Sequence, residues 1–297
     1  MNNPLDSIIK AGNYKRLARI LTIVENDLEG YEDILKSLNI SGGAPVIGIT
    51  GPPGAGKSTL VNALINKLSE NEKRIAVIAV DPTSPFTQGS LLGDRIRMKD
   101  QFNKKNVFIR SIATRGSLGG LSAKIIEMTD VLRDSNFDYI FIETVGVGQS
   151  EVEIARLANV TIVVLVPEAG DEIQTIKSGL MEIADAFIVN KADRPGSGAF
   201  INIIKKFAHQ KSKEIPVIAT IATKGSGIDQ LTEYITKHVY QADTKNEKLL
   251  SEKAWTLIQK KLMSKIDRKS LQEKLMKSSQ EKDFNLYRFV EKYLKSS

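Results

Sequence analysis

The chain has 297 residues, with 42 Lys and Arg against 35 Asp and Glu, a formal net charge of +7, and no cysteine. The lack of cysteine excludes disulfides, thiol catalysis and cysteine metal sites. With 41% hydrophobic residues, the chain can form one large α/β domain with appendages, or two small domains. Its N-terminus has no apolar signal core, and no apolar run reaches the roughly 20 residues of a membrane helix, so we expect a soluble, cytoplasmic protein.

Two apolar stripes at helical spacing predict helices within the first 40 residues. The first stripe runs from Leu17 to Val24 and the second from Tyr31 to Leu38, with charged residues between them. The segment S-G-G-A-P, which ends at Pro45, interrupts this pattern. We therefore expect residues 1–42 to form an N-terminal helical extension that packs against the domain that follows.

A strand, a glycine-rich loop and a helix come next, in the order that a phosphate-binding loop requires. The apolar run Val46–Ile49 predicts a buried strand, and residues 51–59 contain the pattern G-x-x-x-x-G-K-[ST] followed by Thr59. The loop N–H groups and the positive end of the helix dipole then face one polyphosphate, with Lys57 at its β- and γ-phosphates and Ser58 on Mg²⁺. A glycine-rich turn that binds nothing is the alternative. The predicted nucleotide-binding residues here are Gly51, Pro52, Pro53, Gly54, Ala55, Gly56, Lys57, Ser58 and Thr59.

Two acidic residues follow the next predicted strand. Asp81 ends the apolar run of residues 74–80, and Asp94 lies in the loop-to-helix element after it. An acid at the carboxyl end of a strand beside a phosphate loop can hold Mg²⁺ directly or through water. An Asp-Pro turn at Asp81 and a helix cap at Asp94 explain the same residues, so both interpretations stay open.

The strand predicted over residues 138–144 ends in an acid and leads into a second glycine-rich segment. Glu143 occupies the position of the second metal-side motif of phosphate-loop proteins. Gly146 and Gly148 would let the backbone approach or leave the γ-phosphate, as in a segment that switches when GTP is cleaved. A glycine-rich loop that does not switch is the alternative. Gln149 is the candidate for orienting the water that attacks the γ-phosphorus.

A further core strand over residues 161–167 precedes the charged segment E-A-G-D-E-I-Q-T-I-K. Its acidic start and Lys177 suit the beginning of a helix whose charges face the nucleotide or a partner. The spacing alone fits a solvated helix start equally well.

The strand that begins at Ala186 ends in N-K-A-D. An Asp193 carboxylate at this position accepts hydrogen bonds from the ring N–H and the amine of guanine, whereas adenine offers a different edge. We expect Asn190 to tether the loop and the Lys191 stem to cover the base. The strand of residues 216–220 then leads into a loop that can close over the base with its backbone N–H groups, although an ordinary strand–turn–helix also fits. The candidates in that loop are Ala222, Thr223 and Lys224.

Apolar strands that alternate with helices predict an α/β fold with a doubly wound, mostly parallel sheet, the G domain of a P-loop NTPase, over residues 43–240. Residues 241–297 show helical spacing instead. From Lys245 onward there are 14 basic and 7 acidic residues, which leaves 28 of each sign before it. The tail interleaves both signs, so it resembles a solvated helix face, and we expect no nucleic-acid or membrane partner. Its apolar stripe must be covered by its own domain or by a second copy.

Together these motifs resemble the MeaB/ArgK family of GTPases, which are associated with methylmalonyl-CoA mutase. The resemblance covers residues 41–240 in detail and the helical extensions in outline. It is carried by G-P-P-G-A-G-K-S-T, V-D-P-T-S with G-D thirteen residues later, E-T-V-G-V-G-Q-S-E, G-D-E-I-Q-T-I-K and N-K-A-D.

This resemblance implies an enzyme that binds and hydrolyses GTP. It also implies a homodimer formed partly by the C-terminal helices, and a cobalamin-dependent acyl-CoA mutase as protein partner. GTP binding and hydrolysis would gate the loading of adenosylcobalamin into methylmalonyl-CoA mutase and protect that enzyme from inactivation. The implied Mg²⁺-linked residues are Ser58, Asp81, Asp94 and Glu143, and the segment with Lys177 is implied to be a switch that contacts the mutase. With the residues assigned from the motifs above, the candidate catalytic residues are Lys57, Glu143, Gln149 and Lys177.

Three other functions remain to be weighed. A nickel-delivery GTPase shares the fold, but nickel needs thiolates or clustered imidazoles, and this chain has no Cys and only His209 and His238. A signal-recognition GTPase would carry a Met-rich RNA-binding domain, which six scattered Met do not supply. A small-molecule kinase linked to arginine and ornithine transport, after the older family name, would be favoured by equal affinity for ATP and GTP.

Overall fold

The computed structural model describes residues 13–39, 43–81, 98–113, 124–144, 146, 153–167, 180–209, 215–239 and 243–296. The chain divides into two compact units, Met1–Asn246 and Glu247–Ser297, and each is described by itself. Within the described ranges, no helix combines the length and the apolar character needed to cross a membrane.

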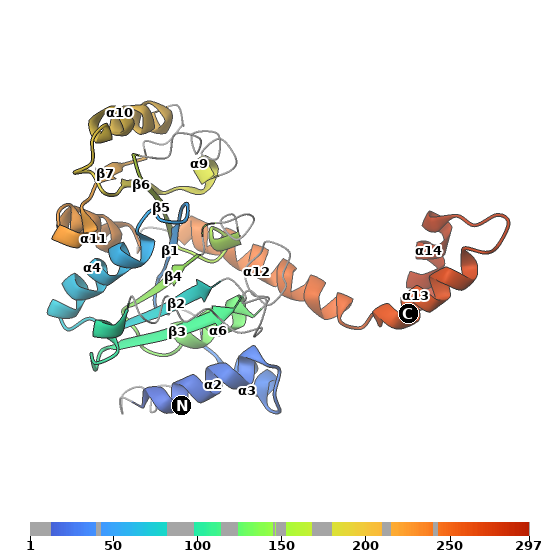
Figure 1. The fold of residues 1–297 in the computed structure, drawn as a ribbon. Helices are drawn as coiled ribbons and strands as arrows, with labels where there is room; N and C mark the ends of the chain where they lie inside the picture. Colours follow the sequence, from blue (N-terminus) through green and yellow to red (C-terminus); the bar gives the residue numbers. More distant parts are fainter. Residues whose placement is uncertain are drawn as a thin grey trace. The chain divides into compact units, whose positions relative to one another are not determined.

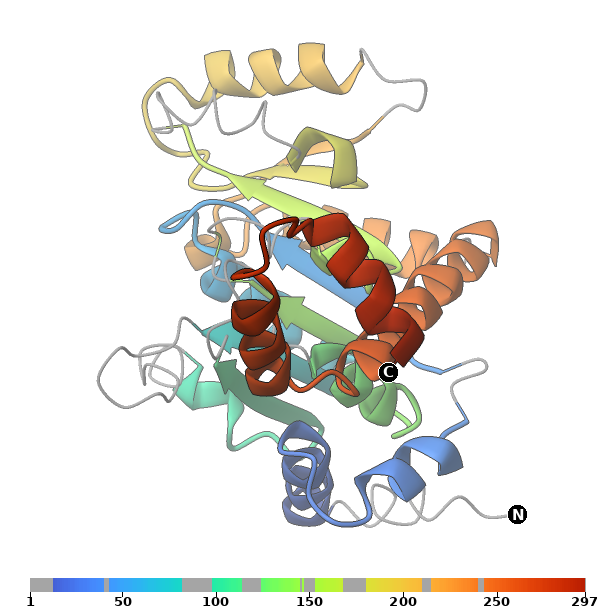
Figure 2. The ribbon, with the colours of Figure 1, turned by 90° about the vertical axis from the view of Figure 1, so that its right-hand side faces the viewer.

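The first unit is built on a seven-stranded sheet in the order β3-β2-β4-β1-β5-β6-β7. Every neighbouring pair is parallel, and the arrowheads of the strands point the same way in Figure 2. The strands are β1 (Val46–Thr50), β2 (Ile75–Asp81), β3 (Val107–Ala113), β4 (Tyr139–Glu143), β5 (Val160–Leu165), β6 (Ala186–Val189) and β7 (Val217–Ala219). The chain runs from β1 to β2 and β3 on one side, returns to place β4 between β2 and β1, and then crosses to β5, β6 and β7 on the other side. Because all strands are parallel, the loops after β1 and its neighbours gather at one edge of the sheet. The predicted doubly wound parallel sheet is confirmed.

Helices cover both faces of this sheet (Figure 1). Because side chains alternate along a strand, Ile47 points to one face and Val46 to the other, and both are fully buried. The first face packs on α4 and α11, and the second on α2, α6 and α10. Their bounds are α2 (Tyr14–Glu25), α3 (Tyr31–Ser37), α4 (Lys57–Glu70), α6 (Ile125–Arg133), α9 (Met181–Ile183), α10 (Ser197–Ala208) and α11 (Ile228–His238), with 3-10 turns η1 (Lys99–Gln101) and η3 (Ala222–Lys224). Burial on both faces explains why the strands read as continuous apolar runs.

An Asn or Asp stands directly before each of four strands and ties it to the backbone at a neighbouring strand. Asn106 Nδ2 donates to Lys73 O (2.8 Å), and the N–H groups of Arg74, Val46 and Thr161 donate to Asp138 Oδ2 (2.7 Å), Asn159 Oδ1 (2.8 Å) and Asp185 Oδ2 (2.8 Å). These bonds pair backbone groups at the amino ends of the strands, where the sheet ladder has not yet begun. They fix the register at the edge opposite the loops that follow the strands.

We expect Asn159→Ala to destabilise the fold by about 1–3 kcal/mol, because the buried Val46 N–H would lose its acceptor. Urea unfolding followed by circular dichroism measures this change in the free energy of unfolding. Asn103→Ala, at an exposed turn position, is the matched control and should stay within about 0.5 kcal/mol of the wild type. Equal losses in the two variants would contradict this role of Asn159.

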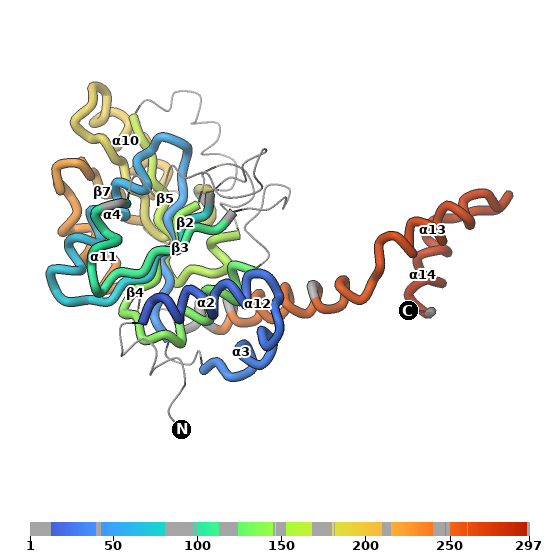
Figure 3. Tube along the Cα trace, turned by 60° about the horizontal axis from the view of Figure 1, so that its bottom comes forward, coloured from blue at the N-terminus to red at the C-terminus, as the bar shows by residue number. Residues whose placement is uncertain are grey.

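The N-terminal helices α2 and α3 form a helical pair that packs on the second face of the sheet (Figure 3). Leu17, Leu21 and Val24 of α2 are fully buried there. Arg110 of β3 pairs with Glu25 at 2.6 Å, and Lys124 at the start of α6 pairs with Asp27. The apolar stripe predicted for the first of these helices is therefore the face that the sheet unit buries.

The second unit contains α13 (Arg268–Ser278), α14 (Leu286–Ser296) and most of α12 (Asp243–Met263). Asp267 caps α13 by accepting from the N–H groups of Lys269 and Ser270, as an N-cap residue does. Large apolar side chains of this unit are exposed in the single chain, with exposed fractions of 62% for Trp255 and 84% for Tyr287. The predicted C-terminal helices are present, and much of their apolar surface is uncovered.

Candidate functional site

In the loop between β1 and α4, a lysine side chain donates hydrogen bonds to two backbone carbonyl groups of the same loop. Lys57 begins α4, and its Nζ donates to Gly51 O at 2.8 Å and to Pro52 O at 3.0 Å. The side chain is buried, with 6% exposed. A phosphate oxygen is a stronger partner for an ammonium group than a carbonyl, so a bound polyphosphate can take over these contacts. The loop therefore places one positive charge where the predicted phosphates would lie.

Ser58 and Glu143 meet next to this lysine. Ser58 Oγ donates to Glu143 Oε1 at 2.7 Å, and the two residues are 4% and 5% exposed. The sheet brings these two residues together, because β1 and β4 are adjacent strands and Ile49 of β1 pairs with Glu143 of β4. A hydroxyl and a carboxylate are the oxygen ligands that Mg²⁺ prefers, and Mg²⁺ at phosphate sites takes only one or two protein carboxylates. The residues present therefore fit a magnesium site.

The other two predicted metal residues are only partly placed. Asp81 ends β2, two residues beyond the Ala79 that pairs with Glu143, and its side chain lies outside the described residues. Asp94 lies outside them altogether. Among the described residues, no group of three or more His, Cys, Asp or Glu forms a cluster that could hold a metal. Of the four predicted metal residues, Ser58 and Glu143 are therefore the two whose side chains lie in the described part of the site.

The segment after β4 returns to the phosphate loop. Thr144 donates its hydroxyl to Thr50 at 2.9 Å, which joins the ends of β4 and β1. Gly146 has a φ of +88°, and a Cβ placed there would lie 2.0 Å from Gly51 O and 2.7 Å from Lys57 Nζ. Glycine at residue 146 therefore lets the segment after Glu143 touch the loop that would hold the phosphates.

Asn190 ties three parts of the site together. Its Nδ2 donates to Ala55 O in the phosphate loop at 2.9 Å, and its Oδ1 accepts from Thr220 Oγ1 (3.1 Å) and Ala222 N (3.2 Å). Asn190 is 2% exposed, and a Cβ at Gly56 would lie 2.4 Å from its Nδ2. Asn190 thus joins the phosphate loop to the loops after β6 and β7, and a side chain at residue 56 would collide with it.

Asp193 projects from the same loop but is half-exposed. Its Oδ2 accepts from Lys224 Nζ at 3.1 Å. This hydrogen bond to the Lys224 ammonium holds the pKa of the Asp193 carboxyl below its usual range. The backbone N–H groups of Ala222 and Lys224 are already used, by Asn190 Oδ1 and Ile221 O. In this structure Lys224 thus reaches the predicted base site with its side chain.

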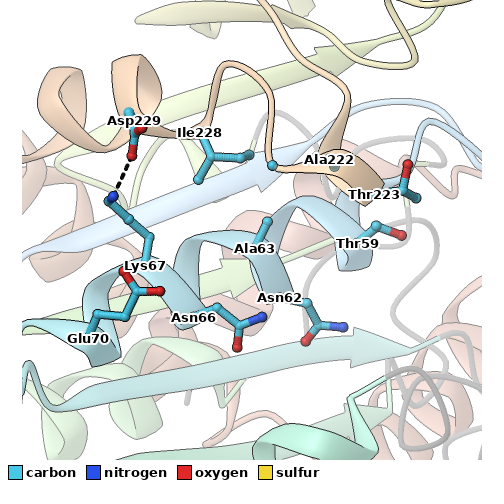
Figure 4. Close-up of a pocket in the computed structure, with 11 residues that line it drawn as sticks. Thr59, Asn62, Ala63, Asn66, Lys67, Glu70, Ala222, Thr223, Ile228 and Asp229 are labelled. Atoms are coloured by element: carbon cyan, nitrogen blue, oxygen red, sulfur yellow. Dashed lines mark ion pairs between the residues drawn. The ribbon is translucent and has the colours of Figure 1, made fainter.

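A groove of about 440 Å³ runs along α4 beside this loop. Figure 4 shows Thr59 and Thr223 at one end of it and the Lys67–Asp229 ion pair, at 2.6 Å, at the other. Asn62 and Asn66 line the α4 side between these ends. Since Thr59 follows the phosphate loop and Thr223 belongs to the predicted base loop, the groove adjoins the place where the nucleotide is expected.

The sheet brings most of the predicted site residues to one edge. The phosphate loop, Glu143, the Asn190–Asp193 loop and the Ala222–Lys224 turn all lie at the carboxyl ends of β1, β4, β6 and β7. Two of the predicted catalytic residues, Gln149 and Lys177, lie outside the described residues. Sequence reasoning missed the side-chain contact of Lys224 with Asp193 and the contact of Thr220 with Asn190, and no local motif signals either.

A model of the family "Methylmalonyl Co-A mutase-associated GTPase MeaB" matches residues 17–278. A protein of Pyrococcus abyssi that is named as a GTPase candidate is 48% identical over 77% of this chain and 74% of its own length. The mitochondrial methylmalonic aciduria type A homolog of Mus musculus is 34% identical over 73% of this chain and 56% of its own length. The crystal structure of a LAO/AO transport system kinase superposes with a TM-score of 0.67 at 25% identity, over 92% of this chain and 83% of the other.

Proposed function

Since this chain belongs to the MeaB family of GTPases, we propose that it is a chaperone for a cobalamin-dependent acyl-CoA mutase such as methylmalonyl-CoA mutase. In this proposal GTP and Mg²⁺ bind at the site described above. Binding and hydrolysis of GTP then gate the loading of adenosylcobalamin into the mutase and protect the mutase from inactivation. The observation that carries the nucleotide part is the meeting of Lys57, the Ser58–Glu143 pair and Asn190 at one edge of the sheet.

The proposed chemistry is attack of water on the γ-phosphorus of GTP. Lys57 and the N–H groups of the phosphate loop stabilise the negative charge that spreads over the transferred group. Ser58 and Glu143 would hold Mg²⁺, which neutralises phosphate charge when bound. Asn190 keeps the phosphate loop and the base loop in one arrangement, and the backbone at Gly146 lies close enough to the loop to respond to the γ-phosphate.

Family and relatives support the mutase part of the proposal. The family description names association with methylmalonyl-CoA mutase, and the mouse relative is named for methylmalonic aciduria. The relative named as a transport kinase supplies the other candidate, a small-molecule kinase. Asp193 at the end of an N-K-A-D strand favours the GTPase, because that carboxylate matches the donor edge of guanine.

We also propose that the chain is a homodimer formed partly by α12–α14. The support is the uncovered apolar surface of this unit, which includes Trp255, Tyr287 and Leu294. Such a surface is large for a soluble helical unit unless a second copy covers it. Light scattering should give the mass of two chains, and the mass of one chain would contradict this part.

The mutase proposal is tested by reconstitution with apo-mutase. The full chain is mixed with apo-mutase and adenosylcobalamin, and holo-mutase is followed by cobalamin absorbance with GTP, GDP, a non-hydrolysable GTP analogue, or ATP. We expect the loading rate to differ between the GTP and the analogue samples, and the ATP sample to match the sample without nucleotide. Loading that is the same under all of these conditions would contradict the gating role.

Glu143→Gln should raise the Mg²⁺ concentration needed for half-maximal GTP hydrolysis by about 10-fold or more, since a carboxylate that orients or binds the ion is lost. The amide preserves the size of the buried side chain and can still accept from Ser58. Hydrolysis measured across a Mg²⁺ series tests this, with Glu233→Gln on the exposed face of α11 as control. An unchanged Mg²⁺ requirement in Glu143→Gln would remove Glu143 from the metal site.

A further inference from the structure

A lysine from a different loop contacts the carboxylate that is proposed to read guanine. Lys224 belongs to η3, after β7, whereas Asp193 follows β6, and the two lie 31 residues apart in the chain. Lys224 Nζ donates to Asp193 Oδ2 at 3.1 Å. The contact therefore joins the two loops between which a purine would bind.

The turn that carries this lysine is held in place. Lys224 N–H donates to Ile221 O at 2.8 Å, and Ala222 N–H donates to Asn190 Oδ1 at 3.2 Å. Asn190 in turn holds the phosphate loop through Ala55 O. The backbone from which Lys224 extends is thus fixed relative to both the phosphate loop and the base loop.

The charged groups near Asp193 come from two elements. Lys191, with a φ of +56°, and Arg194 lie on its own loop, and Lys224 comes from η3. The Lys224 ammonium is the charged partner that hydrogen-bonds the carboxylate and favours its ionised form. Both partners are partly exposed, with side-chain exposed fractions of 66% and 41%, so the pair contributes little to the stability of the fold.

We propose that Lys224 is a positioning residue for guanine recognition, whose ammonium holds the Asp193 carboxylate in the orientation that faces the purine. This inference rests on the proposed function. A carboxylate has about four lone-pair sites, so one bond to Lys224 leaves room for the ring N–H and the amine of guanine. Once a purine covers the carboxylate and displaces water, the attraction of the nearby ammonium grows, because the local dielectric falls.

The expected pH dependence has a definite sign. Asp193 must be ionised to accept two hydrogen bonds from guanine, and a lowered pKa keeps it ionised to lower pH. Affinity for GDP should then be lost as the pH falls through the pKa of Asp193. Removal of the ammonium should move this loss to higher pH.

The test compares Lys224→Met, Lys224→Arg and Lys67→Met in the full chain. Lys67→Met removes the same charge from the Lys67–Asp229 pair at the far end of the groove, so it is the matched control. The dissociation constants of GDP and of IDP, which lacks the 2-amine, are measured by calorimetry at pH 7.5 and at lower pH values. Circular dichroism confirms the pH range over which each variant stays folded.

We expect Lys224→Met to weaken GDP by about 3- to 10-fold at pH 7.5 and IDP by less, so that the preference for GDP over IDP falls. As the pH is lowered, Lys224→Met should begin to lose its affinity for GDP at a higher pH than the wild type does. Lys224→Arg should restore the preference, and Lys67→Met should match the wild type. If a variant unfolds before the acid loss appears, the GDP-to-IDP ratio at pH 7.5 decides.

An unchanged GDP-to-IDP ratio in Lys224→Met, or an equal change in Lys67→Met, would overturn the inference. Its failure is distinguishable from failure of the proposed function. A wild-type chain that binds GDP no better than ADP would refute the nucleotide site itself. A wild-type chain that prefers GDP, with Lys224→Met unaltered, would refute only the role of Lys224.

Discussion

Lys57→Met should lower the rate of GTP hydrolysis by about 10²- to 10³-fold, the usual cost of removing one group that stabilises transition-state charge. In the structure the ammonium is buried and bonded to Gly51 O and Pro52 O, so it is already directed into the loop. Methionine keeps most of the stem and removes the charge. Single-turnover phosphate release measures the change.

The control for this variant is on the same helix. Lys67→Met removes one positive charge from α4 but breaks only the ion pair with Asp229 at the surface. We expect it to hydrolyse GTP at the wild-type rate. Hydrolysis by Lys57→Met within about 3-fold of the wild type would contradict the role assigned to this lysine.

Asp193→Asn should exchange the base preference of the protein from guanine to xanthine. Guanine presents two donors to the carboxylate, whereas xanthine has a carbonyl in place of the amine. An asparagine amide offers one acceptor and one donor, so it matches xanthine and leaves a guanine donor unpaired. We expect GTP affinity to fall by about 10²-fold, with XTP then preferred over GTP.

Competition of GTP and XTP for a fluorescent nucleotide analogue measures this exchange. Asp229→Asn, which loses an acidic partner of Lys67 away from the base loop, is the control and should keep the wild-type preference. If Asp193→Asn still prefers GTP over XTP as strongly as the wild type does, the carboxylate does not read the base.

The phosphate loop and the N-K-A-D strand end were predictable because each is a short, contiguous pattern. Their chemistry depends on residues that are neighbours in the chain, such as Lys57 and Ser58. The apolar runs likewise predicted the strands, because a parallel sheet buried on both faces requires them. No single segment of the sequence reveals the order of the strands in the sheet. The contact of Ser58 with Glu143 could therefore not be predicted, because it depends on β1 lying beside β4.

Long-range contacts account for what the sequence did not reveal. Asn159 precedes a strand like many other residues, and only the register of β1 and β5 shows that it pairs the Val46 N–H. Lys224 was expected to act through its backbone, but its side chain pairs with Asp193 from another loop. The roles of Asp94, Gln149 and Lys177 stay predictions, because these residues lie outside the described ranges.

The second unit shows the same division between local and long-range information. Helical spacing predicted helices where the structure has α12 and α14. Asp267 caps α13 because it directly precedes that helix. The spacing also marked an apolar stripe that must be covered. The spacing of apolar residues does not show what covers that stripe, because the partner of an apolar helix face depends on the shape of the surface and not on the repeat of the sequence.

The most direct test of the central claim is calorimetric titration of the full chain with GDP and with ADP in the presence of Mg²⁺. Recognition through the Asp193 carboxylate predicts that GDP binds at least about 10²-fold more tightly than ADP, because adenine does not offer that carboxylate the ring N–H and amine that guanine offers. Equal affinity for the two nucleotides, or no binding of either, would contradict the account.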